Sequence, residues 1–280
     1  SSFEEQYDCI SATLGNSKEW CSVGNNVSYL YSCQSNSYYQ TPYQFFDSCL
    51  QSYQLARTGQ AYAAFTGYIT TSSFSSNKYA QVKLMDTLES NKLYCVSFYL
   101  SLWNYSRYSM DKIGAILTST PFPCLPPATA PNYTITGVTP QIISPVGVQL
   151  DDTLNWMEVG STYIANGTEA YLTIGDFFLP SQHSIIQSYP ANCNAVATYY
   201  IDDVSVEEVQ VAKAKNDTLI YAMDSVIIGA NNSEAALFSW QPTTGLSCTN
   251  CPNPKASPNV TTTYTVTKTQ CKSVTTDEIT

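Results

Sequence analysis

Cysteine is the residue type in this chain that could most readily do chemistry. The sequence has ten cysteines and a single histidine, which favours disulfides formed outside a reducing cytosol over zinc sites. The spacing Cys248-x-x-Cys251 could be a redox motif, but redox pairs of this kind sit at the start of a helix. Here the pair lies in a proline-flanked loop, so we expect a structural bridge between Cys248 and Cys251.

The remaining cysteines leave their pairing open. Seven cysteines lie before residue 211 and three after it: 9, 21, 33, 49, 95, 124 and 193, then 248, 251 and 271. Odd counts on both sides mean that one bridge crosses between the two parts or between molecules, or that each part keeps a free thiol. Spacing allows a bridge between Cys21 and Cys49.

Catalytic chemistry has little support in the sequence. His183 lies in a Ser/Gln/Pro-rich loop without a nucleophile motif such as Gly-x-Ser-x-Gly, so we expect it to be a polar surface residue. Paired carboxylates could make a glycosidase. The candidates are Asp151, Asp152, Glu158, Glu169 and Asp176, but nothing in the sequence places two of them across a cleft, and Asp151-Asp152 is more typical of a turn. We expect a protein that is not an enzyme.

A glycan-binding platform is the sharper hypothesis. A pyranose ring stacks on an aromatic side chain while its hydroxyls bind fixed polar groups. The loop that follows residue 102 offers Trp103, Tyr105 and Tyr108 as rings, with Asn104 and Arg107 as polar partners. The alternative is that Trp103 belongs to the core and that the other residues form an ordinary loop. We expect Trp20, Trp156 and Trp240 to be core residues.

These residues would be positioned by β-strands. Alternation of β-branched and aromatic residues with polar ones, between turn signals, predicts half-buried strands. Such segments recur at 61–66, 93–102, 113–118, 156–163, 169–174, 199–211, 225–228, 237–240 and 262–267. The first sixty residues have poor periodicity, and we expect long loops there, joined by disulfides, with at most a short helix around 45–54. The predicted fold is all-β.

Two domains are expected. The strand 199–211 closes the first domain, residues 1–211, and the polar segment 212–217 leads into the second, residues 212–280. Domains as small as the second one usually need additional stabilisation, such as disulfides. Its block from Trp240 to Thr267, with a Cys-x-x-Cys loop between two strands, predicts a small immunoglobulin-like sandwich.

Composition limits the possible partners. The net charge is −10 with only 12 Lys+Arg, and phosphate contacts need clustered cations, so we expect no nucleic-acid partner. No apolar run approaches the ~20 residues of a membrane span. The chain does not begin with a signal peptide, so an exported protein would follow a removed leader or be an expressed fragment.

Two sets of motifs resemble known families. Residues 2–5 (Ser-Phe-Glu-Glu) and the strand 200–206 look like the opening and closing strands of galactose-binding-like jelly rolls. A narrower group, the large surface proteins of gliding-type bacteria that use type IX secretion, is similar over most of the chain. The matching segments are 58–63, 93–102, 111–115, 155–156, 171–177 and 240–267, with Cys271 and Thr276-Asp277 behind them. No type IX sorting domain is present.

This resemblance implies a jelly-roll β-sandwich, with carbohydrate-binding modules among its relatives, followed by a small PKD/Ig-like β-sandwich. It implies a structural Ca²⁺ held by Glu4 with Asp202 and Asp203, because these carboxylates lie on adjacent strands in such jelly rolls and Ca²⁺ prefers oxygen ligands. The alternative is that the two aspartates form an edge turn and Glu4 is solvated. The resemblance also favours a bridge between Cys9 and Cys33.

The function expected first is that of an extracellular cell-surface protein that serves adhesion or assembly. Strand residues that the relatives have at both ends are missing, and an open strand position invites pairing with a neighbour. The partners would be copies of the same chain, in a filament or layer, or other surface proteins. The alternative function is a glycan-binding module from a secreted polysaccharide-active protein.

Overall fold

The computed structural model describes most of the chain, in eleven stretches. These are residues 19–24, 27–31, 54–69, 78–124, 135, 137–189, 193, 195–221, 224–231, 236–271 and 273–280. Contacts divide the chain into two compact units, one of residues 1–92 and 96–206 and the other of residues 93–95 and 207–280. The domain boundary predicted from the sequence, after residue 211, lies five residues beyond the observed one, after residue 206.

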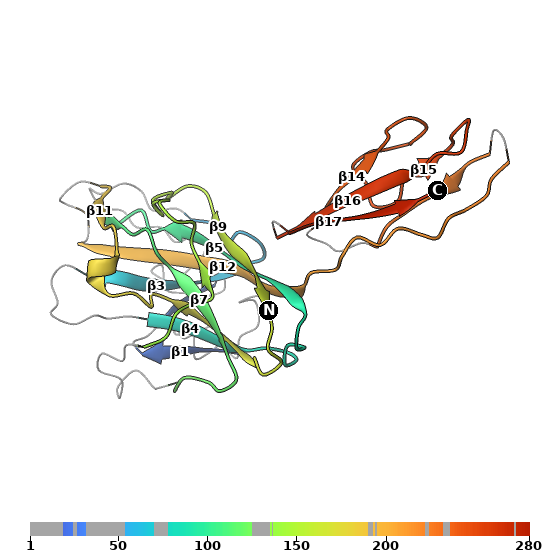
Figure 1. The fold of residues 1–280 in the computed structure, drawn as a ribbon. Coiled ribbons are helices and arrows are strands. Elements are labelled where there is room, and N and C mark those ends of the chain that lie inside the picture. Colours follow the sequence, from blue (N-terminus) through green and yellow to red (C-terminus); the bar gives the residue numbers. More distant parts are fainter. Residues whose placement is uncertain are drawn as a thin grey trace. The chain divides into compact units, whose positions relative to one another are not determined.

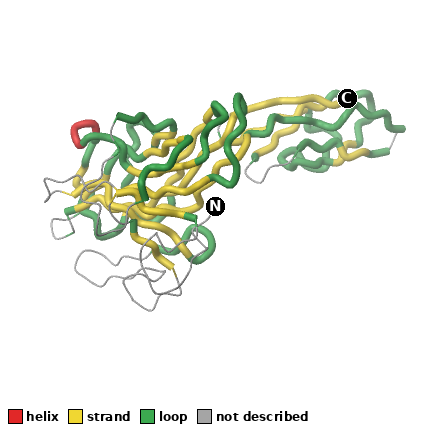
Figure 2. Tube along the Cα trace, turned by 90° about the horizontal axis from the view of Figure 1, so that it is seen from below, coloured by secondary structure: helices red, strands yellow, loops and turns green. Residues whose placement is uncertain are grey.

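The described regular structure is made of β-strands and one short 3-10 turn, Pro180–Gln182 (Figure 2). The predicted all-β fold is therefore confirmed. Among the described residues, no helix is long and apolar enough to cross a membrane.

The first unit is a sandwich of two five-stranded sheets (Figure 1). The first sheet has the order β1-β4-β10-β7-β8, with strands Trp20–Gly24, Lys78–Lys83, Tyr171–Gly175, Gly114–Thr118 and Ile142–Ile143. The second sheet has the order β2-β3-β12-β5-β9, with strands Ser28–Tyr31, Ala61–Ile69, Val196–Glu208, Leu93–Leu102 and Met157–Ile164. Two short strands, β6 (Tyr108–Ser109) and β11 (Ile186–Gln187), form a separate antiparallel pair.

Alternation along the strands explains which side chains face the core. In β5, Val96, Phe98 and Leu100 are fully buried, whereas the intervening Ser97 and Tyr99 are half-buried. Successive side chains of a strand point to opposite faces, so one face of the second sheet supplies core residues and the other faces away from the sandwich. This outer face carries the candidate site.

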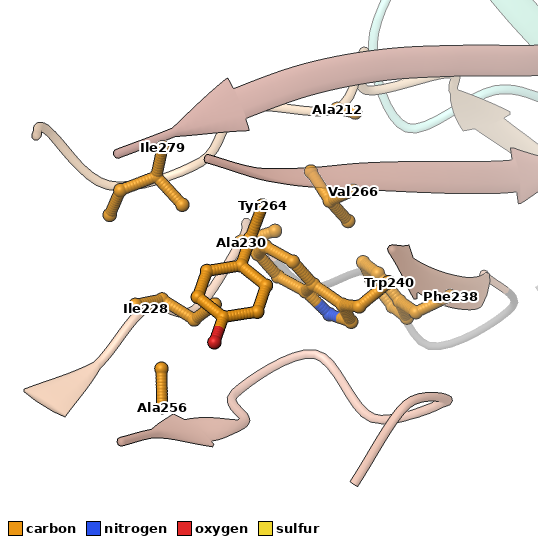
Figure 3. Close-up of a cluster of buried hydrophobic side chains, with 9 residues drawn as sticks. All are labelled: Ala212, Ile228, Ala230, Phe238, Trp240, Ala256, Tyr264, Val266 and Ile279. Carbon is orange, nitrogen blue, oxygen red and sulfur yellow. The ribbon is translucent and has the colours of Figure 1, made fainter. Parts of the chain in front are cut away.

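The second unit is a smaller sandwich. Strand β13 (Val226–Ile227) pairs with β15 (Lys255–Ala256), and the three-stranded sheet β14-β16-β17 is formed by Leu237–Gln241, Tyr264–Gln270 and Ser273–Ile279. Its core contains Ala212, Ile228, Ala230, Phe238, Trp240, Ala256, Tyr264, Val266 and Ile279 (Figure 3). The Trp240 indole donates a hydrogen bond to the Cys251 carbonyl at 3.0 Å, which satisfies its polar edge inside this core.

Three disulfides have both cysteines in the described part of the chain: Cys21–Cys124, Cys95–Cys271 and Cys248–Cys251. The structural bridge between Cys248 and Cys251 is confirmed. The pairing of Cys21 with Cys49 is wrong, because Cys21 is bonded to Cys124, 103 residues along the chain. Cys193 also takes part in a disulfide, and none of the described cysteines is free.

Cysteines 9, 33 and 49 lie outside the described residues, so the predicted bridge between Cys9 and Cys33 stays a prediction. The bridge between Cys95 and Cys271 joins a residue before the predicted domain boundary to one after it. A bridge across this boundary was one of the alternatives that the odd counts left open, but both cysteines belong to the second compact unit.

Strand prediction failed near the start of the chain. The segments Trp20–Gly24 and Ser28–Tyr31 were expected to be loops but form β1 and β2. Their register with β4 and β3 shows the reason: both pair with strands that follow much later in the sequence. The helix expected around 45–54 falls outside the described residues except for Gln54, which is not helical.

Candidate functional site

The outer face of the second sheet carries large aromatic side chains. On β12, Tyr199 and Ile201 point into the core, so Tyr200 points outward, and Tyr200 lies opposite Ala64 of β3. Tyr62 of β3 is therefore also on the outer side, as are Tyr99 of β5 and Trp103 just beyond it. We call Tyr62, Tyr99, Trp103, Trp156 and Tyr200 the aromatic face.

Three rings of the aromatic face are joined by edge-to-face contacts. The Tyr62 ring lies 4.9 Å from the Tyr200 ring and 5.9 Å from the Trp156 ring, measured between centroids, and both pairs are T-shaped. Tyr62 and Tyr200 are buried, while Trp103 and Trp156 pack against them and are partly buried. Tyr99 is also half-buried. Three rings thus keep part of their surface open.

Fixed polar groups lie among these rings. The Tyr62 hydroxyl donates to the carbonyl of Gln54 at 3.1 Å, and the Ser101 hydroxyl donates to the Gln54 side-chain oxygen at 3.2 Å. Gln54 and Ser101 are 4 % and 0 % exposed. The Arg57 guanidinium lies 3.5 Å from the centre of the Tyr99 ring, a cation–π arrangement, and its side chain is partly exposed.

Asp202 and Asp203 hold the segment that carries Arg57. Asp202, 1 % exposed, accepts the Arg57 backbone N–H at 2.7 Å. Asp203 accepts hydrogen bonds from the Arg57 guanidinium and the Thr58 hydroxyl. The cation next to Asp203 is therefore an arginine, and charge balance there does not require a metal.

The calcium site stays a prediction. Glu4, its third expected ligand, lies outside the described residues, and the described part of the chain holds no group of three or more His, Cys, Asp or Glu side chains that could bind a metal. Asp202 and Asp203 by themselves do not form such a site. Thermal unfolding with and without EGTA, followed by added Ca²⁺, tests the prediction.

The predicted glycan-binding loop is divided between two environments. Trp103 lies on the aromatic face and contacts Tyr105, with ring centroids 5.3 Å apart and ring planes tilted by 30°. Asn104 and Tyr105 are only 5 % and 6 % exposed, and Tyr105 packs against Cys193. Neither of these two residues is open to a sugar in this structure.

The other two predicted residues have structural contacts. The Arg107 guanidinium donates to the Cys193 carbonyl at 2.8 Å. Tyr108 makes a T-shaped contact with Tyr68 at 5.6 Å and is half-buried. Both residues therefore hold the loop in place. Their partners in these contacts, Cys193 and Tyr68, are not members of the aromatic face.

Sequence reasoning missed four members of the aromatic face and Arg57. Trp156 was expected in the core, but it is half-buried and packs on the outer side of the sheet, whereas Trp20 and Trp240 are buried as expected. The sequence did contain a signal for part of this face. Residues 99, 101 and 103 alternate with the apolar residues 96, 98, 100 and 102, so they could have been assigned to the outer face of the predicted strand 93–102.

His183 is buried, which contradicts the expectation of a surface residue. Its side chain is 2 % exposed and lies between two carboxylates, with Nε2 3.0 Å from Asp176 and Nδ1 3.6 Å from Asp111. Asp176 also accepts the Phe178 N–H and Asp111 accepts the Ser184 N–H. The three side chains therefore fasten the segment 176–184 to the start of β7.

The remaining candidate carboxylates also have structural partners. Asp152 accepts the N–H groups of Leu154 and Asn155, both at 2.8 Å, which confirms the predicted turn. Glu169 is 1 % exposed and accepts hydrogen bonds from the Tyr163 hydroxyl and from three consecutive N–H groups, those of residues 166–168.

These hydrogen bonds set the charge state of Glu169. Burial alone would raise the pKa of Glu169, but the N–H donors and the Tyr163 hydroxyl hold this pKa below its ordinary value. Burial, together with the Glu169 carboxylate, raises the pKa of Tyr163 to about 12. The pair therefore consists of an ionised carboxylate and a neutral phenol at neutral pH.

Comparison with known proteins gives only distant likenesses. No protein-family model and no curated protein matches the chain. Among solved structures, the CBM22-1–GH10 part of xylanase 10B from Clostridium thermocellum, complexed with xylohexaose, is 13% identical with a TM-score of 0.37. The match covers 76% of this chain and 28% of that chain.

Two single domains are similarly distant. The CBM22-1 xylan-binding domain of Xyn10C from Paenibacillus barcinonensis is 14% identical, with 75% of this chain and 93% of that chain covered and a TM-score of 0.37. The N-terminal cellulose-binding domain of β-1,4-glucanase C from Cellulomonas fimi is 12% identical, with 75% and 99% covered and a TM-score of 0.33.

Proposed function

We propose that this is an extracellular, non-enzymatic carbohydrate-binding protein that holds a glycan on its aromatic face. The observation that carries the proposal is the combination of half-buried rings, Trp103, Trp156 and Tyr99, with a partly exposed guanidinium, that of Arg57, fixed beside them. Disulfides in both units fit an oxidising, extracellular setting.

The chemistry of the face suits a sugar. A pyranose has a face of C–H groups that stacks on an aromatic ring, and equatorial hydroxyls that need donors and acceptors at fixed positions. Arg57 supplies donors beside the Tyr99 ring. Because its backbone is held by Asp202 and its guanidinium by Asp203, little side-chain entropy would be lost when a sugar binds.

The competing explanation is that the aromatic face is a small second core. Tyr62 and Tyr200 fit that explanation, since they are buried against each other. Trp156 and Tyr99 distinguish the two cases, because they retain exposed surface and can be truncated without opening a buried cavity.

A glycan array with the whole chain tests the proposal, followed by calorimetric titration with the glycans that bind. We expect Trp156→Ala and Tyr99→Ala each to weaken binding about tenfold, which corresponds to about 1.4 kcal/mol. Tyr171→Ala, a half-buried tyrosine on β10 of the other sheet, is the matched control and should bind normally.

Two results would count against the proposal. One is an array without any binding, and the other is binding that survives both aromatic-face substitutions. Adhesion or assembly with copies of the same chain, which the sequence placed first, stays a prediction that no feature of the aromatic face favours. Membership of the type IX surface proteins likewise stays a prediction.

A further inference from the structure

The second unit has a cavity of its own, separate from the aromatic face. It has a volume of about 490 Å³ and lies between residues 217–221, residues 258–262 and the last residues of β17. This volume is within the range of about 300–1,000 Å³ that is usual for small-molecule sites.

The floor of the cavity is one end of the core of the second unit. Ile228, Ala256, Tyr264 and Ile279 line it, and Figure 3 shows these four side chains grouped together, away from Phe238. Each of the four is at most 3 % exposed. The floor is therefore apolar and rigid, and includes one aromatic ring.

The rim combines exposed apolar side chains with neutral polar groups. Leu219, Tyr221 and Val260 are 98 %, 85 % and 74 % exposed. Between them, hydroxyl groups are supplied by threonines such as Thr261, and an amide is supplied by Asn259. An aromatic ring at an open rim, next to hydroxyls and an amide, offers both a stacking surface and hydrogen-bonding partners.

Among the described residues that line the cavity, Asp217 is the one side chain with a full charge. One of its oxygens accepts the Thr280 N–H at 2.9 Å, which fixes the carboxylate, and its other oxygen has lone pairs available. A fixed carboxylate accepts hydrogen bonds from ligand hydroxyls, and such bonds to a charged group are stronger than neutral ones.

The lining excludes two ligand classes. Phosphates, sulfates and acidic sugars would bring a negative charge next to Asp217, and none of the described residues that line the cavity is a lysine, arginine or histidine that could balance it. A wholly apolar ligand would bury the carboxylate and the rim hydroxyls without partners, which is costly. A neutral ligand with one apolar face and several hydroxyls avoids both costs.

From this lining we infer a second carbohydrate site in the cavity, one that takes a neutral sugar of one or two pyranose rings. Tyr221 provides the stacking ring and Asp217 the fixed acceptor. This site goes beyond the proposed function because it uses other residues on the other unit, and it can stand if the aromatic face binds nothing.

The test is an NMR titration of the whole isotope-labelled chain with neutral saccharides: glucose, galactose, mannose, N-acetylglucosamine, xylose, cellobiose and lactose. We expect at least one of them to shift the amide signals of residues 217–221 and 258–262. Tyr221→Ala and Asp217→Asn should each weaken that binding at least tenfold. Asparagine keeps the acceptor for Thr280 N–H, so the fold should tolerate the second substitution.

Two control variants make the outcome decisive. Leu237→Ala removes another apolar side chain of the second unit that is 74 % exposed and should leave binding unchanged. Trp156→Ala separates the two sites: shifts at 217–221 that persist in this variant support the cavity site, even if array binding is lost.

The inference is overturned if no saccharide shifts the cavity signals, or if all sugar binding disappears with Trp156→Ala. It is also overturned if Tyr221→Ala abolishes binding while Asp217→Asn has no effect, because Asp217 is then not the acceptor on which the inference depends.

Discussion

The outer faces of two antiparallel sheets differ sharply in this protein. In the three-stranded sheet of the second unit, the outward positions of neighbouring strands align Ser239 with Thr267 and Thr267 with Thr276. Small hydroxyl side chains are typical of a solvated β-surface, where polar residues alternate with buried ones. The same face also carries two single exposed aliphatic side chains, Leu237 and Val274, which are 74 % and 62 % exposed. The corresponding face of the second sheet in the first unit carries the aromatic face.

The difference separates ordinary surface from candidate site. Both sheets bury an inner face that forms a core. The need for a core therefore explains the inward-facing residues of each sheet, but it does not explain the residues on either outer face. A mostly polar outer face with single exposed aliphatic side chains needs no further explanation, whereas a group of large rings that remain partly exposed is costly in water and points to something that covers it. In the proposal above, that is a glycan.

The largest expected effect is on stability and compares two tryptophans. Trp240 is fully buried in the core of the second unit, so Trp240→Ala should lower the free energy of unfolding of that unit by about 3–5 kcal/mol. Trp156→Ala, on the aromatic face, should cost less than about 2 kcal/mol. Guanidinium unfolding monitored by fluorescence measures both, and equal losses would show that the aromatic face is a core.

A second prediction concerns the turn that follows the edge strand β9. Glu169→Gln removes a carboxylate that accepts four hydrogen bonds, and we expect a loss of roughly 1.5–3 kcal/mol at pH 7. Because the folded state lowers the pKa of Glu169, its contribution is fully present above the pKa of the unfolded chain, about 4.3.

This contribution should disappear as the pH falls through the lower pKa of the folded state. Urea unfolding of both proteins from pH 7 to pH 2.5 checks the sign: the difference between them should shrink as the pH falls. Glu158→Gln, at an exposed position of β9, is the control. A difference that grows towards acid pH would contradict the prediction.

A third prediction concerns the backbone of the same turn. Gly167 has a φ of +94°, and a Cβ placed there would lie 2.9 Å from the Ser90 Cβ. Gly167→Ala should therefore destabilise the first unit by about 1–3 kcal/mol, measured as a lower Tm. Gly147→Ala provides the comparison, because Gly147 also has a positive φ but a Cβ there would meet nothing within 4 Å.

The smallest expected effect is on the hydroxyl face of the second unit. Thr267→Val keeps the shape and β-propensity of the side chain and removes an outward hydroxyl, so stability should change by no more than about 0.5 kcal/mol. Glycan binding should not change. A loss of binding would mean that the hydroxyl face, and not only the aromatic face, contacts ligand.

Much of the strand structure could be predicted because it is local. The strand 93–102 is observed at these bounds, and the segments around 61–66, 113–118, 199–211 and 237–240 are strands with ends shifted by a few residues. Their alternation depends on neighbours two positions away, and that information lies within each segment. Strands β1 and β2 were missed because their stability comes from distant partners.

The candidate site could be predicted only in part. Trp103 was singled out as a platform residue, and it lies on the aromatic face; its role in binding stays a prediction. Its neighbours on the aromatic face come from β3, from the residue before β9 and from β12, so that positions as far apart as Tyr62 and Tyr200 meet. Nothing local to Tyr62 or Trp156 distinguishes an outward ring from a buried one.

The all-β class, most strand positions and the bridge between neighbouring Cys248 and Cys251 could be read from the sequence alone, because each depends on residue types or short spacings. Only the tertiary structure decided which faces of the strands are open, that Cys21 meets Cys124, that His183 is buried between two aspartates, and that Arg57 lies on Tyr99. These contacts join segments that are distant in the chain, and strand order and register, which are properties of the whole fold, bring them together.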